Sequence, residues 1–122
     1  MTKEETPPQN ELFRENVSLI TRKGSLFLLV NLMVWPPDYW KFPQGGVNPG
    51  ESLEDAARRE FQEELGTESM RIAAKSGVTR RYRWEAPITI HGQAYVGQEQ
   101  TFFLVEFLGE EEDIELGKNV CS

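Results

Sequence analysis

Residues 40–67 read WKFPQGGVNPGESLEDAARREFQEELGT, a loop rich in glycine and proline followed by one helical segment. Ser52, with Asp55 three positions later, forms a capping-box pattern that marks a helix start. Gly66 is typical of the residue that ends a helix. These signals predict a helix over Leu53–Leu65.

The predicted helix has an apolar and an acidic stripe side by side. At about 100° per residue, one compact stripe is formed by Leu53, Ala57, Phe61 and Leu65. The carboxylates of Glu60, Glu63 and Glu64 share an arc of about 100° directly beside it. Glu60 and Glu64 repel each other at this spacing. A divalent cation such as Mg²⁺ or Mn²⁺ would offset the repulsion, and a solvated acidic face is the alternative.

The spacing of glycine, arginine and acids around this helix resembles the Nudix box. That pattern is Gly, five residues, Glu, seven residues, then Arg-Glu-apolar-x-Glu-Glu-x-Gly-apolar. The matching positions are Gly45, Glu51, Arg59, Glu60, Phe61, Glu63, Glu64 and Gly66. Thr67 departs from it, since the pattern has an apolar residue there. Seven positions fixed in identity arise by chance in roughly 10⁻⁹ to 10⁻⁸ of windows, so the resemblance is specific.

Three further motifs resemble one Nudix branch, which contains bacterial RNA 5′-pyrophosphohydrolases and asymmetric dinucleoside-tetraphosphate hydrolases. Residues 40–52 resemble its Trp-x-Phe-Pro-Gln-Gly-Gly-x-x-x-Gly-Glu stretch. Residues 13–17 resemble its aromatic-Arg-x-Asn-Val strand entry, and residues 97–103 resemble its Gly-Gln-x-Gln-x-aromatic-Phe strand. The implied fold is α/β, a Nudix α/β/α sandwich with a mixed sheet.

The resemblance also implies a site. The metal ligands would be Glu60, Glu63 and Glu64, with backbone groups of Gln44 and Gly45. The catalytic set would be Glu63 or Glu64 as the base, Arg59 holding a glutamate and Glu51 bracing the loop. The substrate-binding set would be Arg14, Lys41, Gln98 and Gln100. A guanidinium suits a terminal phosphate through two-point pairing, which supports Arg14.

The chain departs from the family pattern in two respects. Asn31 and Thr101 stand where family members often carry a basic residue that binds phosphate. Lys41 or the arginines at 80, 81 and 83 could take over that role. The chain also has room for little of the last strand and the C-terminal helix, and no counterpart of an additional catalytic glutamate is found. Either this is a shortened form, or a partner subunit covers the sheet. In the second case the partner could be another copy of this chain, in a homodimer.

The implied activity is Mg²⁺-dependent hydrolysis of a diphosphate linkage at the triphosphorylated 5′ end of RNA. The alternatives are hydrolysis of a dinucleoside polyphosphate such as diadenosine tetraphosphate, and a housecleaning nucleoside-triphosphate pyrophosphatase. A nucleotide-binding regulatory domain without turnover is the non-enzymatic alternative.

Length and composition indicate one small domain. The chain has 122 residues, with residues 1–10 expected as a flexible leader and residues 11–122 as the domain. Cys121 is the only cysteine, so no internal disulfide exists. The longest apolar run, Leu26–Val30, is too short for a membrane span, and the N-terminus does not resemble a signal peptide. We therefore expect a cytoplasmic protein.

The formal net charge of −7 is distributed unevenly. Residues 106–115 contain six acids and no base, which favours a solvated turn. Residues 71–83 contain five bases and no acid, so they form either a patch for a polyanion or a solvated strand edge. Tyr82 and Trp84 are candidates for stacking on nucleic acid.

Strands are expected at residues 16–21, 26–31, 70–74, 78–84, 88–90 and 101–108. Residues 22–25 are expected as a hairpin turn, and residues 43–46 as a flexible stretch.

Overall fold

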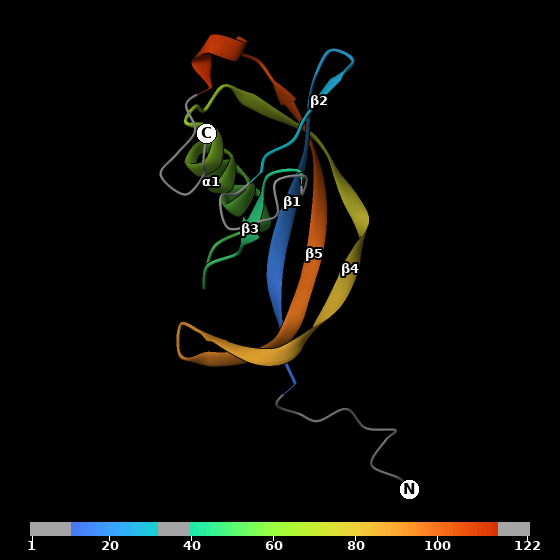
Figure 1. Cartoon of the computed structure of the whole chain (residues 1–122), viewed down its shortest axis with the longest axis vertical. Helices are drawn as coiled ribbons and strands as arrows, with labels where there is room; N and C mark the ends of the chain where they lie inside the picture. Colours follow the sequence, from blue (N-terminus) through green and yellow to red (C-terminus); the bar gives the residue numbers. More distant parts are fainter. Residues whose placement is uncertain (1–10, 32–39, 115–122) are drawn as a thin grey trace, which may run out of the picture.

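The computed structural model describes residues 11–31 and 40–114. Its elements, in chain order, are β1 (Phe13–Lys23), β2 (Leu26–Leu28), β3 (Gln44–Gly46), α1 (Leu53–Leu65), β4 (Met70–Ile90), β5 (Gln93–Phe107) and a 3₁₀ turn, η2 (Glu111–Asp113). The sheet order is β2-β1-β5-β4, and β3 also pairs with β1 (Figure 1). The pairing of β1 with β5 is parallel and the other pairings are antiparallel, so the predicted mixed sheet is confirmed.

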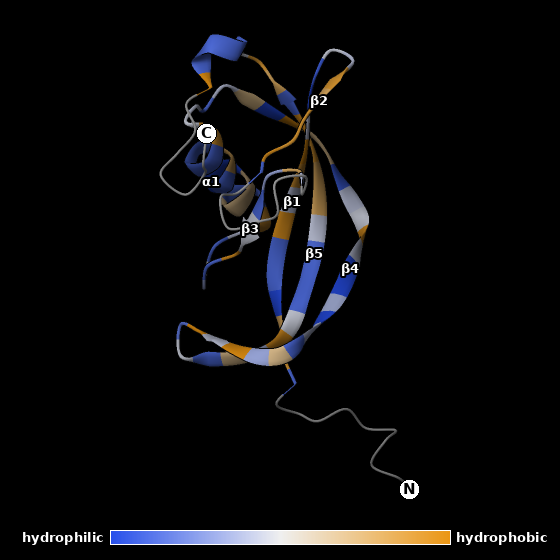
Figure 2. Cartoon of the chain, viewed as in Figure 1, coloured by the Kyte–Doolittle hydropathy of each residue, from blue (hydrophilic) through white to orange (hydrophobic). Residues whose placement is uncertain are grey.

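The core lies between α1 and one face of the central strands. Side chains alternate between the two faces of a strand, so odd-numbered residues of β1 and β5 face the helix. The fully buried apolar side chains there include Val17, Leu19, Phe61, Leu65, Phe103 and Val105. Hydrophobic stretches of β1 and β5 lie next to α1, whereas β4 alternates between hydrophilic and hydrophobic segments (Figure 2). This packing fixes which face of α1 turns towards the sheet.

The helix prediction is confirmed at both ends. The Oγ atom of Ser52 accepts a hydrogen bond from the backbone N–H of Asp55 at 3.0 Å. Gly66 adopts a left-handed conformation with φ 72°, and its N–H donates to the carbonyl of Gln62. Local capping signals therefore specify this element from sequence.

The strand predictions are confirmed in part. The hairpin at residues 22–25 is present, with Lys23 opposite Leu26 and Gly24 at φ 60°. The strand expected at 26–31 ends at Leu28, and Val30 forms an isolated bridge with Lys41. The three strands expected between residues 70 and 90 are one strand, β4, whose register shifts lie near the expected breaks. Strand β5 begins at Gln93, earlier than expected, because the hairpin with β4 extends the ladder.

The expectation of a flexible stretch at residues 43–46 is wrong, because Gln44–Gly46 forms strand β3. Two glycines give this segment little strand propensity of its own. It pairs because β1 offers an open edge: the carbonyl of Pro43 accepts from Leu19 N–H at 2.7 Å, and the carbonyl of Glu15 accepts from Val47 N–H at 2.9 Å. Tertiary pairing thus overrides the local preference.

Helix α1 is the one α-helix among the described residues, in agreement with a sandwich that has little of its C-terminal helix. No helix in this part of the chain is long and apolar enough to cross a membrane. The expected leader and Cys121 lie outside the described residues.

Candidate active site

Helix α1 and strand β3 bring the predicted acidic cluster together. The buried stripe of α1 docks on the sheet, which turns Glu60 and Glu64 towards β3 and leaves both carboxyl groups largely buried. Glu63 lies further out, with 47% of its side chain exposed. The three glutamates therefore differ in environment, although they are close in sequence.

Arg59 joins the loop, the helix and β3. Its Nε atom donates to Oε2 of Glu51 at 2.8 Å, and its Nη2 atom donates to Oε1 of Glu51 and to the carbonyl of Gly46, both at 2.9 Å. Its Nη1 atom donates to Glu60 at 2.9 Å and to Glu63 at 3.3 Å. One guanidinium thus contacts three carboxylates and a backbone carbonyl, a geometry that lysine cannot reproduce.

The pKa of Glu51 is lowered to about 2, first by its hydrogen bonds from Arg59. The backbone N–H of Asn48 also donates to Glu51, at 3.0 Å, and further stabilises the carboxylate. The pKa of Arg59 is raised by the same pairing. Glu51 therefore stays ionised and holds residues 46–51 against the helix.

Glu60 and Glu64 have the opposite shift. Burial raises the pKa of Glu64 to about 8, and the neighbouring charge of Glu60 adds to the rise. The pKa of Glu60 is also raised, chiefly by burial, although the hydrogen bond from Arg59 opposes this. If both of these partly buried carboxyl groups were ionised, their negative charge would exceed what Arg59 alone neutralises, and the raised pKa values reflect this crowding.

The two glycines of β3 leave room for charged side chains on opposite faces. A Cβ atom on Gly45 would overlap the carboxyl group of Glu60, and one on Gly46 would overlap the guanidinium of Arg14. Only glycine at these positions lets both groups approach the strand. Arg14 and Glu60 are thus separated by the thickness of one strand.

The chemistry of this cluster fits a divalent cation. Carboxylate and backbone oxygens are hard ligands of the kind that Mg²⁺ and Mn²⁺ prefer, and a bound cation would relieve the crowding of Glu60 and Glu64. Within residues 11–31 and 40–114, however, no three His, Cys, Asp or Glu side chains are grouped so that they could hold one ion. In this arrangement Arg59 occupies the carboxylates of Glu60 and Glu63.

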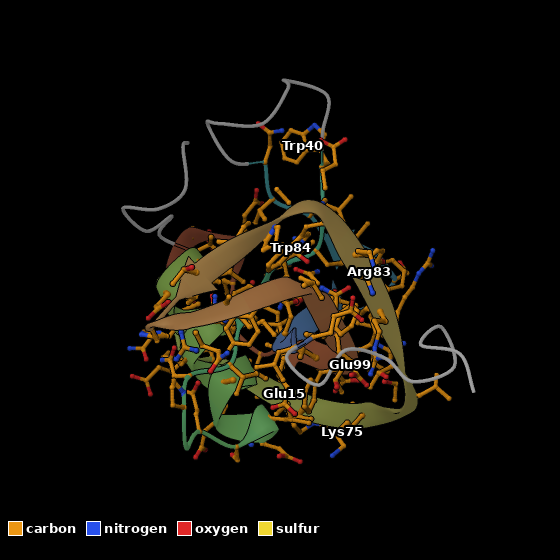
Figure 3. The ribbon with its side chains drawn as sticks, turned by 90° about the horizontal axis from the view of Figure 1, so that it is seen from below. Glu15, Trp40, Lys75, Arg83, Trp84 and Glu99 are labelled. Atoms are coloured by element: carbon orange, nitrogen blue, oxygen red, sulfur yellow. The ribbon has the colours of Figure 1, made fainter. Side chains whose placement is uncertain are left out.

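A cavity of about 710 Å³ lies on the sheet face away from α1. Its lining includes Trp40, Lys41, Gln44, Tyr82, Trp84, Gln98 and Gln100. Figure 3 places Trp40 and Trp84 on this side, whereas Glu15 and Lys75 lie on the side of α1. Three of the predicted substrate-binding residues thus line one cavity, and β3 separates it from the acidic cluster.

Most of the basic segment at residues 71–83 is neutralised by acids. Its ion pairs are Arg71–Glu106, Lys75–Glu54, Arg81–Glu99 and Arg83–Glu11. Among the described residues Arg80 has no ion pair, and its guanidinium lies 5.2 Å from the ring centroid of Tyr82. The prediction of a strand edge therefore fits better than a patch for a polyanion, with four of the five basic residues paired to acids as well as exposed to solvent. Only Arg80 remains a candidate for a polyanion.

Two residues of the site carry no role in the sequence interpretation. Asn48 stabilises the carboxylate of Glu51, and Asn16 accepts a hydrogen bond from Gln100. No local signal in the sequence places Asn16 beside Gln100, because the two residues meet only through the pairing of β1 with β5.

Comparison with known proteins supports the fold and shows the family of this chain. The NUDIX domain family matches residues 12–119. An RNA pyrophosphohydrolase from Wolbachia pipientis wMel is 40% identical over 103 residues, which are 82% of this chain and 62% of the relative. An RNA pyrophosphohydrolase from Caulobacter vibrioides is 40% identical over 84 residues, covering 66% of this chain and 49% of the relative. The chain thus spans less than two thirds of the length of these relatives.

Among solved structures, a C. elegans Ap4A hydrolase in a binary complex has a TM-score of 0.62 and 26% identity, and the match covers 89% of this chain and 76% of that one. A NUDIX hydrolase from Nitrosomonas europaea has a TM-score of 0.64 at 21% identity, with 88% and 68% covered, and supports the fold alone.

Proposed function

Because the chain belongs to the Nudix family, we propose that it hydrolyses a diphosphate linkage at the 5′ end of a nucleotide substrate with the help of Mg²⁺ or Mn²⁺. The triphosphorylated 5′ end of RNA is the first substrate, in keeping with the relatives that are RNA pyrophosphohydrolases. The observation that carries the proposal is the partly buried pair Glu60 and Glu64, held against a glycine strand and joined to the loop by Arg59.

In this proposal the metal ligands are Glu60, Glu63 and Glu64, with backbone groups of Gln44 and Gly45. When bound, a divalent cation would neutralise phosphate charge and activate water. Binding requires Glu60 and Glu63 to turn from Arg59, and the two-point pair with Glu51 keeps the guanidinium in place when they do. Glu63 or Glu64 would then accept the proton of the attacking water.

The substrate would extend from the acidic cluster past β3 into the cavity. Arg14, above Gly46, is suited to a phosphate because a guanidinium offers two parallel donors. Lys41 and Gln98 line the cavity, where Trp40 and Trp84 offer flat surfaces for a base. Gln100 also lines it, although its amide nitrogen is bonded within the protein.

A dinucleoside polyphosphate is the alternative substrate, favoured by the likeness to an Ap4A hydrolase.

The test measures phosphate and pyrophosphate release with Mg²⁺ from 5′-triphosphorylated RNA and from diadenosine tetraphosphate in parallel. Glu64→Gln should abolish release, whereas Glu54→Gln, on the first turn of the same helix, should retain it.

Turnover of diadenosine tetraphosphate but not of RNA would show that the substrate is a dinucleoside polyphosphate and not the 5′ end of RNA. Binding of both substrates without turnover of either would contradict an enzymatic role for this chain and favour a nucleotide-binding regulatory domain.

A further inference from the structure

Gln100 connects three strands through one buried side chain. It lies on β5, on the face away from α1, and is 4% exposed. Its Nε2 atom donates to Oδ1 of Asn16 on β1 at 2.6 Å and to Oε1 of Gln44 on β3 at 2.7 Å. Both N–H groups of this amide are therefore used within the protein.

Strand β3, to which Gln100 is tied, forms one wall of the acidic cluster. The backbone of Gln44 hydrogen bonds to Glu64, Gly45 contacts the carboxyl group of Glu60, and the carbonyl of Gly46 accepts from Arg59. A shift of this strand would move all three contacts together.

The other restraints on strand β3 come from its backbone and from the residues beside it, Pro43 and Val47. The strand pairs with β1 over only three residues, and two of these are glycines without side chains to pack. Gln44 is therefore the only residue of β3 with a side chain that can anchor the strand, and Gln100 holds that side chain. Asn16 fixes Gln100 in turn, because it accepts from the other N–H of the same nitrogen.

We propose that Gln100 is a positioning residue, which fixes β3 and so sets the geometry of the carboxylate site from the opposite face of the sheet. This inference rests on the proposed function, because it assumes that the acidic cluster binds a divalent cation. Loss of partners that orient metal ligands costs about 10- to 100-fold in metal affinity. Gln100 does not contact a carboxylate ligand itself but acts through strand β3. We therefore expect its loss to lower metal affinity by an amount at the lower end of that range.

The test measures Mn²⁺ affinity by electron paramagnetic resonance without substrate. Gln100→Met keeps the length of the side chain and removes both donors, and it should weaken Mn²⁺ binding about tenfold. Gln44→Met breaks the same tie from its other end and should give a similar loss. Because both variants remove one linkage, the double variant should bind Mn²⁺ no more weakly than the worse single variant.

Thr21→Val is the matched control. It also removes a buried hydrogen bond from β1, the one that Thr21 Oγ1 donates to the carbonyl of Leu19 at 3.0 Å, but it lies away from β3. It should lower stability to urea without changing Mn²⁺ affinity. If Gln100→Met does not fold, Gln44→Met alone tests the tie, since Gln44 is less buried.

Two outcomes separate this inference from the proposed function. Mn²⁺ affinity within twofold of wild type in both methionine variants, with a raised KM for Gln100→Met, would overturn the positioning role and leave Gln100 as a substrate-binding residue. Undiminished Mn²⁺ binding by Glu64→Gln would instead overturn the proposed metal site.

Discussion

Gly45 lies so close to the carboxyl group of Glu60 that no side chain fits between them. The obstructing atoms belong to the end of a flexible side chain and not to backbone, so Gly45→Ala should fold with Glu60 displaced. We expect a loss of metal affinity and of turnover of at least tenfold, measured by Mn²⁺ titration and by phosphate release. The melting temperature should change by only a few degrees.

Gly77→Ala provides the control for this substitution. No atom lies within 4 Å of a Cβ atom at Gly77, so the added methyl group meets open space. If Gly45→Ala bound Mn²⁺ as tightly as Gly77→Ala does, Glu60 would not be a metal ligand.

Arg59→Lys should destabilise the protein before any substrate is involved. Lysine cannot span both oxygens of Glu51, the carbonyl of Gly46 and the carboxylate of Glu60 at once. These groups are only partly exposed, so we expect a loss of about 1–3 kcal/mol in the free energy of unfolding, measured in urea.

Arg81→Lys is the comparison, because the pair of Arg81 with Glu99 at 2.9 Å involves a side chain that is 59% exposed. Arg81→Lys should lower the free energy of unfolding by less than about 1 kcal/mol. Equal losses in the two variants would mean that Arg59 contributes nothing beyond a surface ion pair.

The stability of the metal-free protein should fall as the pH rises from 5 to 8.5. Burial raises the pKa of Glu64 from 4.5 to about 8 in the folded state, so the folded protein binds more protons than the unfolded chain in this window. The contribution of Glu64 is complete below pH 4.5 and is lost as the pH passes 8. Acids with a lowered pKa, such as Glu51, change the free energy of unfolding mainly between their folded and unfolded pKa values. For Glu51 this range is about 2 to 4.5, which lies below pH 5.

Urea midpoints in EDTA at pH 5 and 8.5 measure this dependence. Glu64→Gln should flatten the curve, and Mg²⁺ should restore stability to the wild-type protein at pH 8.5 by binding the ionised form. A wild-type midpoint that rises towards pH 8.5 in EDTA would show that Glu64 is ionised without a metal.

The extent to which the sequence predicts this molecule depends on how local each signal is. Ser52 and Gly66 cap α1 through contacts within a few residues, so the helix was predictable from spacing alone. The strand Gln44–Gly46 was not, because its partners on β1 lie far away in sequence and its own residues favour no strand. The acids were predicted as a group, but only the packing of α1 distinguishes partly buried Glu64 from exposed Glu63.

The basic segment illustrates the same limit. Arg81 and Arg83 resemble a patch for nucleic acid as long as only their neighbours in sequence are considered. Their partners are Glu99 on β5 and Glu11 just before β1, and the centroid of the Phe13 ring also lies 4.4 Å from the guanidinium of Arg81. Charge patterning in sequence cannot show which bases are already paired.

We expect Arg80 to distinguish an RNA substrate from a dinucleotide. Arg80 lies on the sheet face away from α1, the same face as Tyr82, which lines the cavity. Arg80 has no ion pair among the described residues. A phosphate beyond the first nucleotides of an RNA could pair with it, whereas a dinucleotide is too short to gain from this contact. Arg80→Ala should therefore raise the KM for triphosphorylated RNA several-fold, leave kcat unchanged and leave the KM for diadenosine tetraphosphate unchanged.

Arg81→Ala is the matched variant, since it removes the same charge from the adjacent position but takes it from a pair with Glu99. Both variants alter the net charge equally, so a non-specific field effect would raise the KM for RNA in both. A selective effect of Arg80→Ala that weakens with added salt would identify a phosphate contact, because ion pairing with phosphate is salt-dependent. An unchanged KM for RNA in Arg80→Ala would confine recognition to the 5′ end and the cavity.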